Sequence, residues 1–149
     1  MKKTLGVNGE VLKLFISKKG EEQRVTMREI EVDENGVVGD KFYGKDPSRS
    51  ILITALDSYI LAKEEGIDMA YGSLGENILM ECSPYHLSVG THFKIGEVIL
   101  EITQNCTLCN SLAKVDKKLP KLLKNDRGIF AKVVKEGTIC ISNRVKNDI

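Results

Sequence analysis

The chain has 149 residues, and its 22 Lys and Arg residues almost balance its 21 Asp and Glu residues, which leaves a formal net charge of +1. A chain of this length can bury most of its apolar surface in one domain without metals or disulfides, so we expect a single domain over residues 1–149. Near-neutral charge argues against nucleic-acid binding, which needs a clustered basic surplus. No segment has the apolar run of a signal peptide or a membrane span, so we expect a cytoplasmic protein without membrane partners.

Short strands separated by glycine turns dominate the chain. Residues 23–32 alternate between apolar and polar side chains, and a slip in phase after Met27 indicates a bulge. Tight hairpins are predicted at Gly96 and over residues 135–138. The other predicted strands are Val11–Ser17, Ser50–Thr54, Asn77–Met80, His92–Ile95, Val98–Thr103, Ile129–Val134 and Thr138–Ser142. This pattern predicts a mainly β protein, a closed or nearly closed barrel with one or two short helices.

Two segments have helical spacing. Thr54 to Asp57 resembles a capping box, which predicts a helix that begins after Thr54, and Gly66 is a suitable residue to end it. A second helix is predicted over residues 110–124, where Pro120 would break or kink it. The end of this segment, residues 114–124, holds five lysines and one aspartate, and we interpret it as a solvated face.

Four cysteines are the main chemical feature, and in a reducing compartment they are expected to be free, catalytic or metal-binding. Cys106 and Cys109 follow a predicted strand. If a helix begins near Asn110, Cys109 lies at its N-terminus, where backbone N–H groups and the helix dipole stabilise a thiolate. Cys106, one turn earlier, suits a resolving thiol or a second ligand.

Other interpretations of the cysteines stay open. Free cysteine is often a small buried apolar residue, and Cys140, inside an apolar strand, is assigned to the core. Cys82 and His86 would complete a tetrahedral zinc site with Cys106 and Cys109. A thioredoxin-like role is disfavoured, because the Cys-x-x-Cys pair follows a hairpin instead of opening the first helix of a βαβ unit.

Several segments, taken in order, resemble the MOSC family, the domain found at the C-terminus of molybdenum-cofactor sulfurases and as small stand-alone proteins. The matching segments are Gly36–Asp40, Arg49–Ile53, Leu74–Ile78, Leu87–Thr91, Phe93–Gly96, Leu100–Gln104, Cys109 with Leu112, and Arg127–Val133 before Gly137. The resemblance covers roughly residues 8 to 145.

The resemblance implies a barrel of the pyruvate-kinase-barrel type with a reactive cysteine, which falls on Cys109. In sulfurase-type members this cysteine is proposed to carry persulfide sulfur, and in reductase-type members it ligates molybdenum bound to a pterin. Family members often have Pro-Arg after the Thr-Gln pair, where this chain has Asn105 and Cys106, and Pro before the cysteine, where it has Leu108. The lost arginine removes one cation for a pterin phosphate, while Cys106 adds a thiol.

Three functions follow from these observations. The first is a sulfur carrier or molybdenum-cofactor handling protein, in which Cys109, with Cys106, carries sulfur or ligates molybdenum. The expected partners are a cysteine desulfurase or other sulfur donor and a molybdoenzyme or cofactor acceptor. The candidate residues for binding an anionic cofactor (molybdopterin) are Arg49, Ser50, Glu76, Asn77 and Arg127. The alternatives are a molybdenum-dependent reductase of N-hydroxylated compounds and a non-enzymatic zinc-binding barrel.

Overall fold

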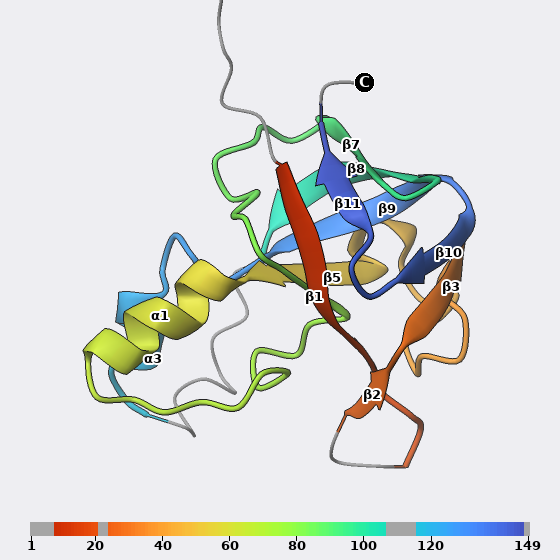
Figure 1. The fold of residues 1–149 in the computed structure, drawn as a ribbon. Coiled ribbons are helices and arrows are strands. Elements are labelled where there is room, and N and C mark those ends of the chain that lie inside the picture. The colour runs from red at the N-terminus through yellow and green to blue at the C-terminus, as the bar shows by residue number, and fades with distance from the viewer. Residues whose placement is uncertain (1–7, 21–23, 107–115, 148–149) are drawn as a thin grey trace, which may run out of the picture.

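A computed structural model describes residues 8–20, 24–106 and 116–147 of the chain. The fold in this part is mainly β, as predicted (Figure 1). Its strands are β1 (Asn8–Ile16), β2 (Val25–Met27), β3 (Glu29–Asp33), β4 (Gly36–Val37), β5 (Ile51–Ala55), β6 (Ile78–Met80), β7 (His92–Ile95), β8 (Val98–Asn105), β9 (Ile129–Lys135), β10 (Gly137–Cys140) and β11 (Arg144–Lys146).

Seven of these strands form a closed barrel. They follow the order β11-β7-β8-β9-β5-β6-β1, and β1 pairs with β11 to complete the ring, while β2 adds to the outer edge of β1. The neighbours are antiparallel except for β5 and β6, which run in parallel. Figure 1 shows β11 lying between β1 and β7. The last strand of the chain thus pairs with the first. Closure leaves the barrel without free sheet edges.

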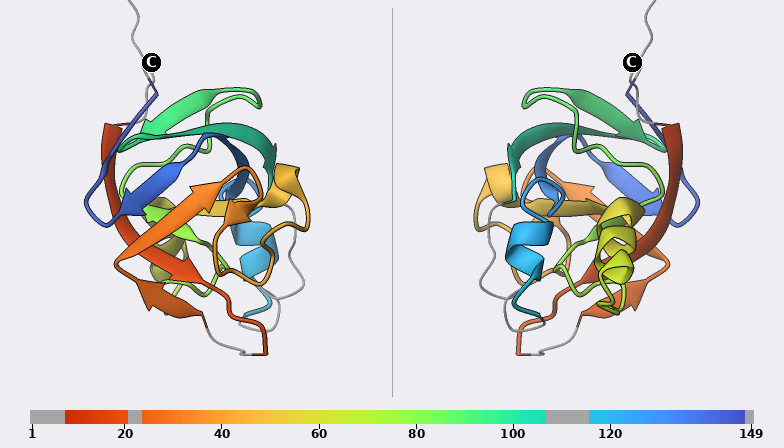
Figure 2. Two further views of the ribbon diagram at one scale, coloured as in Figure 1. Left: turned by 90° about the vertical axis from the view of Figure 1, so that its right-hand side faces the viewer. Right: turned by 90° about the vertical axis from the view of Figure 1, so that its left-hand side faces the viewer.

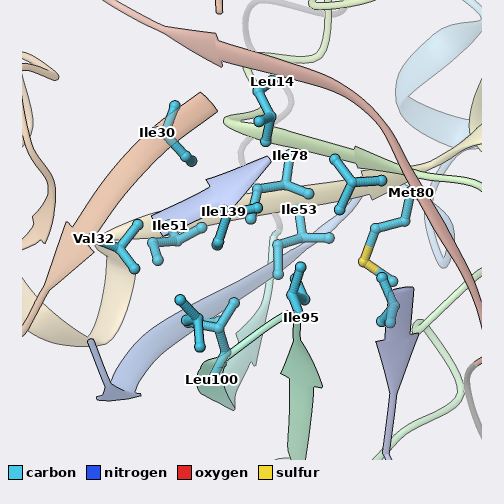
Figure 3. Close-up of a cluster of buried hydrophobic side chains, with 14 of the residues drawn as sticks. Leu14, Ile30, Val32, Ile51, Ile53, Ile78, Met80, Ile95, Leu100 and Ile139 are labelled. Atoms are coloured by element: carbon cyan, nitrogen blue, oxygen red, sulfur yellow. The ribbon is translucent and has the colours of Figure 1, made fainter. Parts of the chain in front are cut away.

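A second, three-stranded sheet, in the order β10-β3-β4, packs against the barrel. Its inward side chains, among them Ile30, Val32 and Ile139, join those of the barrel strands in one apolar cluster. Figure 3 shows these side chains pointing toward one another, together with Ile53 and Leu100 from the barrel. This shared core holds the three-stranded sheet in place against the barrel.

Two α-helices, α1 (Leu56–Glu64) and α3 (Leu119–Leu122), and the 3-10 helix η1 (Pro47–Arg49) occur among the described residues. The α-helices lie on one side of the barrel, the left of Figure 1, which faces the viewer in the right panel of Figure 2. Tyr59 and Ala62 of α1 share an apolar cluster with Leu119 of α3. In the described parts of the chain, no helix is both long and apolar enough to span a membrane.

The expected bulge after Met27 proves to be a larger break. β2 ends at Met27 and β3 begins at Glu29, so the chain leaves the barrel there and enters the second sheet. The predicted hairpin at Gly96 is confirmed, since Gly96 has φ +60° between the paired strands β7 and β8. The predicted hairpin over residues 135–138 is wrong, because β10 pairs with β3 instead of β9.

The predicted helix start also needs correction. Thr54 belongs to β5, the N-cap residue of α1 is Ala55, and no side chain caps the helix, so the capping box does not form. The predicted end at Gly66 is confirmed: its φ is +78°, and the N–H groups of Gly66 and Ile67 donate to the carbonyls of Lys63 and Ala62. This is the Schellman arrangement that favours glycine.

The predicted helix over residues 110–124 is described only from residue 116 onward. There α3 is four residues long, and Pro120 lies in its first turn. Proline is tolerated at this position because the first N–H groups of a helix have no intrahelical partner. Pro120 therefore lies at the start of a short helix that begins at Leu119.

Candidate functional site

A cavity of about 960 Å³ lies beside the ends of β1 and β2, the beginning of β5 and the loops around them. This volume suits a small organic ligand. Its lining residues are Phe15, Ser17, Arg24, Thr26, Lys41, Phe42, Lys45, Asp46, Arg49, Ser50, Leu52, Ala70, Tyr71, Gly72, Ser73, Leu74, Gly75, Asn77, Cys106, Arg127 and Phe130. Segments far apart in the sequence therefore meet at one concave surface.

Positive charge distinguishes this cavity. Among the described residues that line it are five cations (Arg24, Lys41, Lys45, Arg49 and Arg127) and one carboxylate, Asp46, which leaves a formal balance of +4. The whole chain carries only +1, so the surplus is concentrated here. Asp40 and Glu76, both buried, lie close enough to Arg24 to offset part of it. A concave site of this kind attracts an anion.

Arg24 and Arg127 reinforce this preference. Burial lowers the pKa of the Arg24 guanidinium, the charges of Asp40 and Glu76 act against that shift, and the like charge of Arg127 adds to it. The two guanidinium charges repel each other in a partly desolvated cavity. Binding of an anion near both of them offsets this repulsion and is therefore favourable. The electrostatics thus point to an anionic ligand.

Arg49 is the last residue of η1, which holds its backbone in place. Asp46 caps η1 by accepting the Ser48 N–H at 3.0 Å, and Pro47 stands in the first turn. The Arg49 guanidinium lies over the Phe130 ring, with its central carbon 4.9 Å from the ring centroid. This cation–π contact holds the guanidinium in a defined position at the cavity.

Cys106 directly follows β8 and lies in the cavity wall. Its side chain is 2% exposed and packs with Leu52 and Phe130, while its N–H donates to the Gly128 carbonyl at 2.9 Å. Phe130 belongs to the same small cluster as Cys106, and its ring also lies beneath the Arg49 guanidinium. Cys109, the predicted reactive cysteine, lies outside the described residues.

Asn77 lines the cavity, but its amide is committed to the protein. The Nδ2 group donates to the Phe15 carbonyl and to Asp40 Oδ1, each at 3.2 Å, and Oδ1 accepts the Leu52 N–H at 3.1 Å. Asp40 in turn accepts the N–H groups of Ser17 and Phe42. Asn77 and Asp40 thereby tie two barrel strands to the loop that carries Lys41 and Lys45.

Glu76 is fully buried and stands behind the cavity wall, outside its lining. Its Oε2 accepts hydrogen bonds from Thr54 Oγ1 at 2.7 Å and from the Tyr59 hydroxyl at 2.5 Å. Burial and the adjacent Glu76 charge raise the pKa of Tyr59 well above its ordinary range, so this hydroxyl stays protonated and donates. Among the described residues, Oε1 has no hydrogen-bond partner.

Sequence reasoning therefore named several residues that the structure brings together. Arg49, Ser50, Asn77, Cys106 and Arg127 all line the cavity. Ser50 is buried, with a hydroxyl 3.0 Å from the Pro47 carbonyl and 3.3 Å from the Ala131 carbonyl. The roles assigned to these residues stay predictions.

Three cations were missed: Arg24, Lys41 and Lys45. Arg24 directly precedes β2 and Thr26 lies in it, and both line the cavity. Residues two apart in an extended segment share a face, and this alternation was visible in the sequence. Lys41 and Lys45 lie in the loop between β4 and η1, and only the folded chain brings that loop to the cavity.

The zinc alternative loses support. Cys82, His86 and Cys106 are all described, yet no group of three or more potential metal ligands occurs among the described residues. Cys82 packs against the barrel core, and burial raises the pKa of its thiol. Cys82, Cys106 and Cys140 are free cysteines.

The family model described as "MOSC domain" matches residues 39–146, which is more than half of the chain. A search of curated proteins found no match.

Solved structures share the fold. The YuaD protein of Bacillus subtilis aligns with a TM-score of 0.82 at 16% identity, covering 95% of this chain and 96% of that one. YiiM from Geobacillus stearothermophilus aligns with a TM-score of 0.71 at 16% identity, covering 93% of this chain and 74% of that one. YiiM from Escherichia coli gives 0.67 at 18% identity, with coverages of 92% and 68%.

Proposed function

Because this chain belongs to the MOSC domain family, we propose that it handles the molybdenum cofactor or its sulfur, with the Cys109 thiolate as the sulfur carrier or metal ligand. The observation that carries the proposal is one cavity whose described lining includes five cationic side chains and the thiol of Cys106. A phosphorylated pterin would offer an anion to the cations, and thiolates are suitable ligands for a soft metal centre.

The residues present fit such a group. Arginine binds phosphate through two parallel N–H bonds, and the Arg49 guanidinium is already held in place by Phe130. Arg24 and Arg127 would share the anion from the partly buried side of the cavity. When bound, the cofactor would supply the redox chemistry of its metal, while the protein supplies binding and orientation.

Sulfur transfer requires only a thiolate on this chain and a persulfide on a donor protein such as a cysteine desulfurase. The Cys109 thiolate would attack the terminal sulfur of the donor persulfide, forming a new S–S bond. The donor's own S–S bond would break, and the donor would leave as a thiolate, so no net oxidation occurs. A molybdoenzyme or a cofactor-binding protein would then accept the sulfur.

Native mass spectrometry of anaerobically purified protein tests the proposal. After incubation with a cysteine desulfurase and cysteine, we expect one added sulfur atom that a reductant removes. Cys109→Ala should abolish loading, whereas Cys140→Ala, which removes a partly buried strand cysteine, should not. Equal loss in Cys106→Ala would show that the two thiols act together.

Other outcomes separate the alternatives. A copurifying pterin with molybdenum, without sulfur loading, would favour the reductase of N-hydroxylated compounds. Normal loading and normal cofactor retention in Cys109→Ala would contradict the proposal.

A further inference from the structure

One wall of the cavity is a glycine-rich turn, Gly72 to Gly75, whose backbone is held from inside the protein. The N–H groups of Gly72 and Leu74 donate to the Tyr59 hydroxyl oxygen at 3.0 and 3.4 Å. Those of Ser73 and Gly75 donate to the Ala70 and Gly72 carbonyls. All four amides are therefore used within the protein, so anion recognition falls to the cationic side chains.

Tyr59 depends in turn on Glu76. The hydroxyl donates its proton to Glu76 Oε2 at 2.5 Å, which leaves the oxygen lone pairs of Tyr59 for the two wall amides. Thr54 Oγ1 donates to the same carboxylate oxygen from β5. The wall is thus anchored through Tyr59 and Glu76 to a barrel strand.

The same anchor reaches a cation of the cavity. Arg24 Nη1 donates to the Glu76 carbonyl at 3.3 Å, and Arg24 Nη2 lies 3.7 Å from the position that a Cβ on Gly75 would take. The guanidinium therefore rests on the backbone of Gly75 and Glu76. A change in that backbone would move the Arg24 charge within the cavity.

We propose that Tyr59 and Glu76 are positioning residues that hold the Gly72–Gly75 wall and the Arg24 guanidinium for binding of an organic phosphate. The inference rests on the proposed function for its ligand class. It differs from a direct ligand-binding role for Glu76, because the carboxylate is fully buried behind the lining and its contacts are internal.

Tyr59→Phe tests the inference, with Tyr85→Phe as a matched control. Tyr85 is partly buried, and its hydroxyl lies 2.8 Å from the Ala55 N–H and 2.7 Å from Ser58 Oγ, but neither partner lines the cavity. Both variants lose a hydrogen-bonded hydroxyl, so both should lower the melting temperature. Pyrophosphate affinity is measured by calorimetry, and exchange at the Gly72 and Leu74 amides by NMR.

In Tyr59→Phe we expect pyrophosphate affinity to fall about tenfold, the size of effect that the loss of one or two hydrogen bonds produces. Exchange at the Gly72 and Leu74 amides should accelerate at least tenfold. Tyr85→Phe should keep both properties close to wild type. Glu76→Gln, which retains an oxygen acceptor for Tyr59, should keep the two amides protected.

Two results would overturn the inference. Unchanged exchange at Gly72 and Leu74 in Tyr59→Phe would refute the positioning role, whatever the affinity. Equal affinity losses in Tyr59→Phe and Tyr85→Phe would reduce the effect to general destabilisation. If wild-type protein binds no pyrophosphate, an organic phosphate is not the ligand, and the anion site of the proposed function is contradicted too. Amide exchange in Tyr59→Phe then still decides whether Tyr59 holds the Gly72–Gly75 wall.

Discussion

Replacing Arg49 by glutamine should weaken the binding of anions in the cavity more than the loss of one charge elsewhere does. Arg49 is half-buried and held over Phe130, so its N–H groups are oriented before the ligand arrives. A hydrogen bond to a charged group contributes about 1.5–3 kcal/mol. At 1.4 kcal/mol per factor of ten, this loss corresponds to an affinity decrease of about 10- to 150-fold.

The assay is isothermal titration of pyrophosphate at about 0.1 M ionic strength, where the Debye length is about 10 Å. Arg144→Gln is the control for net charge, since Arg144 is half-exposed, lies outside the cavity lining and pairs with Glu10 at 3.5 Å. Screening should keep its effect within about twofold. Arg49→Lys retains the charge but loses the planar fork, so its affinity should lie between those of wild type and Arg49→Gln.

Equal affinity losses in Arg49→Gln and Arg144→Gln would contradict this prediction, because the effect would then follow net charge instead of position. An unchanged affinity for pyrophosphate in Phe130→Leu, which removes the ring beneath the guanidinium, would contradict it as well. Exposed cation–π contacts contribute about 0.5–1 kcal/mol, so a loss of about two- to fivefold is expected there.

Two further predictions concern the scaffold. Gly96→Val should destabilise the fold by about 2–5 kcal/mol in urea unfolding, since left-handed backbone strain adds to a clash of the new Cβ, which would lie 2.8 Å from Asn143 Oδ1. Gly90 has φ +92° but open space around it, so Gly90→Val should lower the free energy of unfolding by only roughly 1–2 kcal/mol. Equal losses in the two variants would show that the clash with Asn143 does not contribute. The hydrogen bond from His92 lowers the pKa of Glu101, so His92→Ala should raise that pKa in an NMR titration. In the wild type the pair stabilises the fold above the pKa that Glu101 has in the unfolded chain. This contribution should be lost as the pH falls through the pKa of Glu101 in the folded protein. An unchanged Glu101 pKa would contradict this assignment.

The sequence predicted those parts of the barrel whose pairing depends on residues close together in the chain. The alternation in His92–Ile95 and the glycine at residue 96 specify a hairpin through short-range geometry, and the structure shows it. β11 (Arg144–Lys146) was missed, because only three residues pair there and their partners in β1 lie at the other end of the chain. Pairing between chain ends leaves little trace in local periodicity, although it closes this barrel.

The wrong expectations share a physical cause, which is competition from tertiary contacts. Thr54 has the side chain of a helix cap, but its hydroxyl donates to buried Glu76, so the capping box does not form. Residues 135–138 have the composition of a hairpin turn, yet β10 gains more by pairing over Gly137–Cys140 with β3, whose Ile30 and Val32 share the core with Ile139. Burial of these apolar side chains outweighs the local preference.

Glu76 and Asn77, two residues of the predicted cofactor site, form hydrogen bonds within the protein. The family resemblance marks Asn77 as a candidate cofactor-binding residue, and Glu76, in the same Gly75–Asn77 segment, as a residue that could orient a ligand. Once buried, such groups must satisfy their own hydrogen bonds, and here the Asn77 amide and Glu76 Oε2 are taken by the protein.

The two residues anchor opposite walls, Glu76 through Tyr59 and Asn77 through Asp40. Recognition of an anion is then left to side chains that the protein does not need for its own folding. The lysines at 41 and 45 in an exposed loop and the guanidinium of Arg49 meet that condition. A substitution at Glu76 or Asn77 should therefore alter ligand affinity through the shape of the cavity, and a substitution at Arg49 through direct contact. The ratio of affinity loss to stability loss separates the two cases, being small for Asn77→Ala and large for Arg49→Gln.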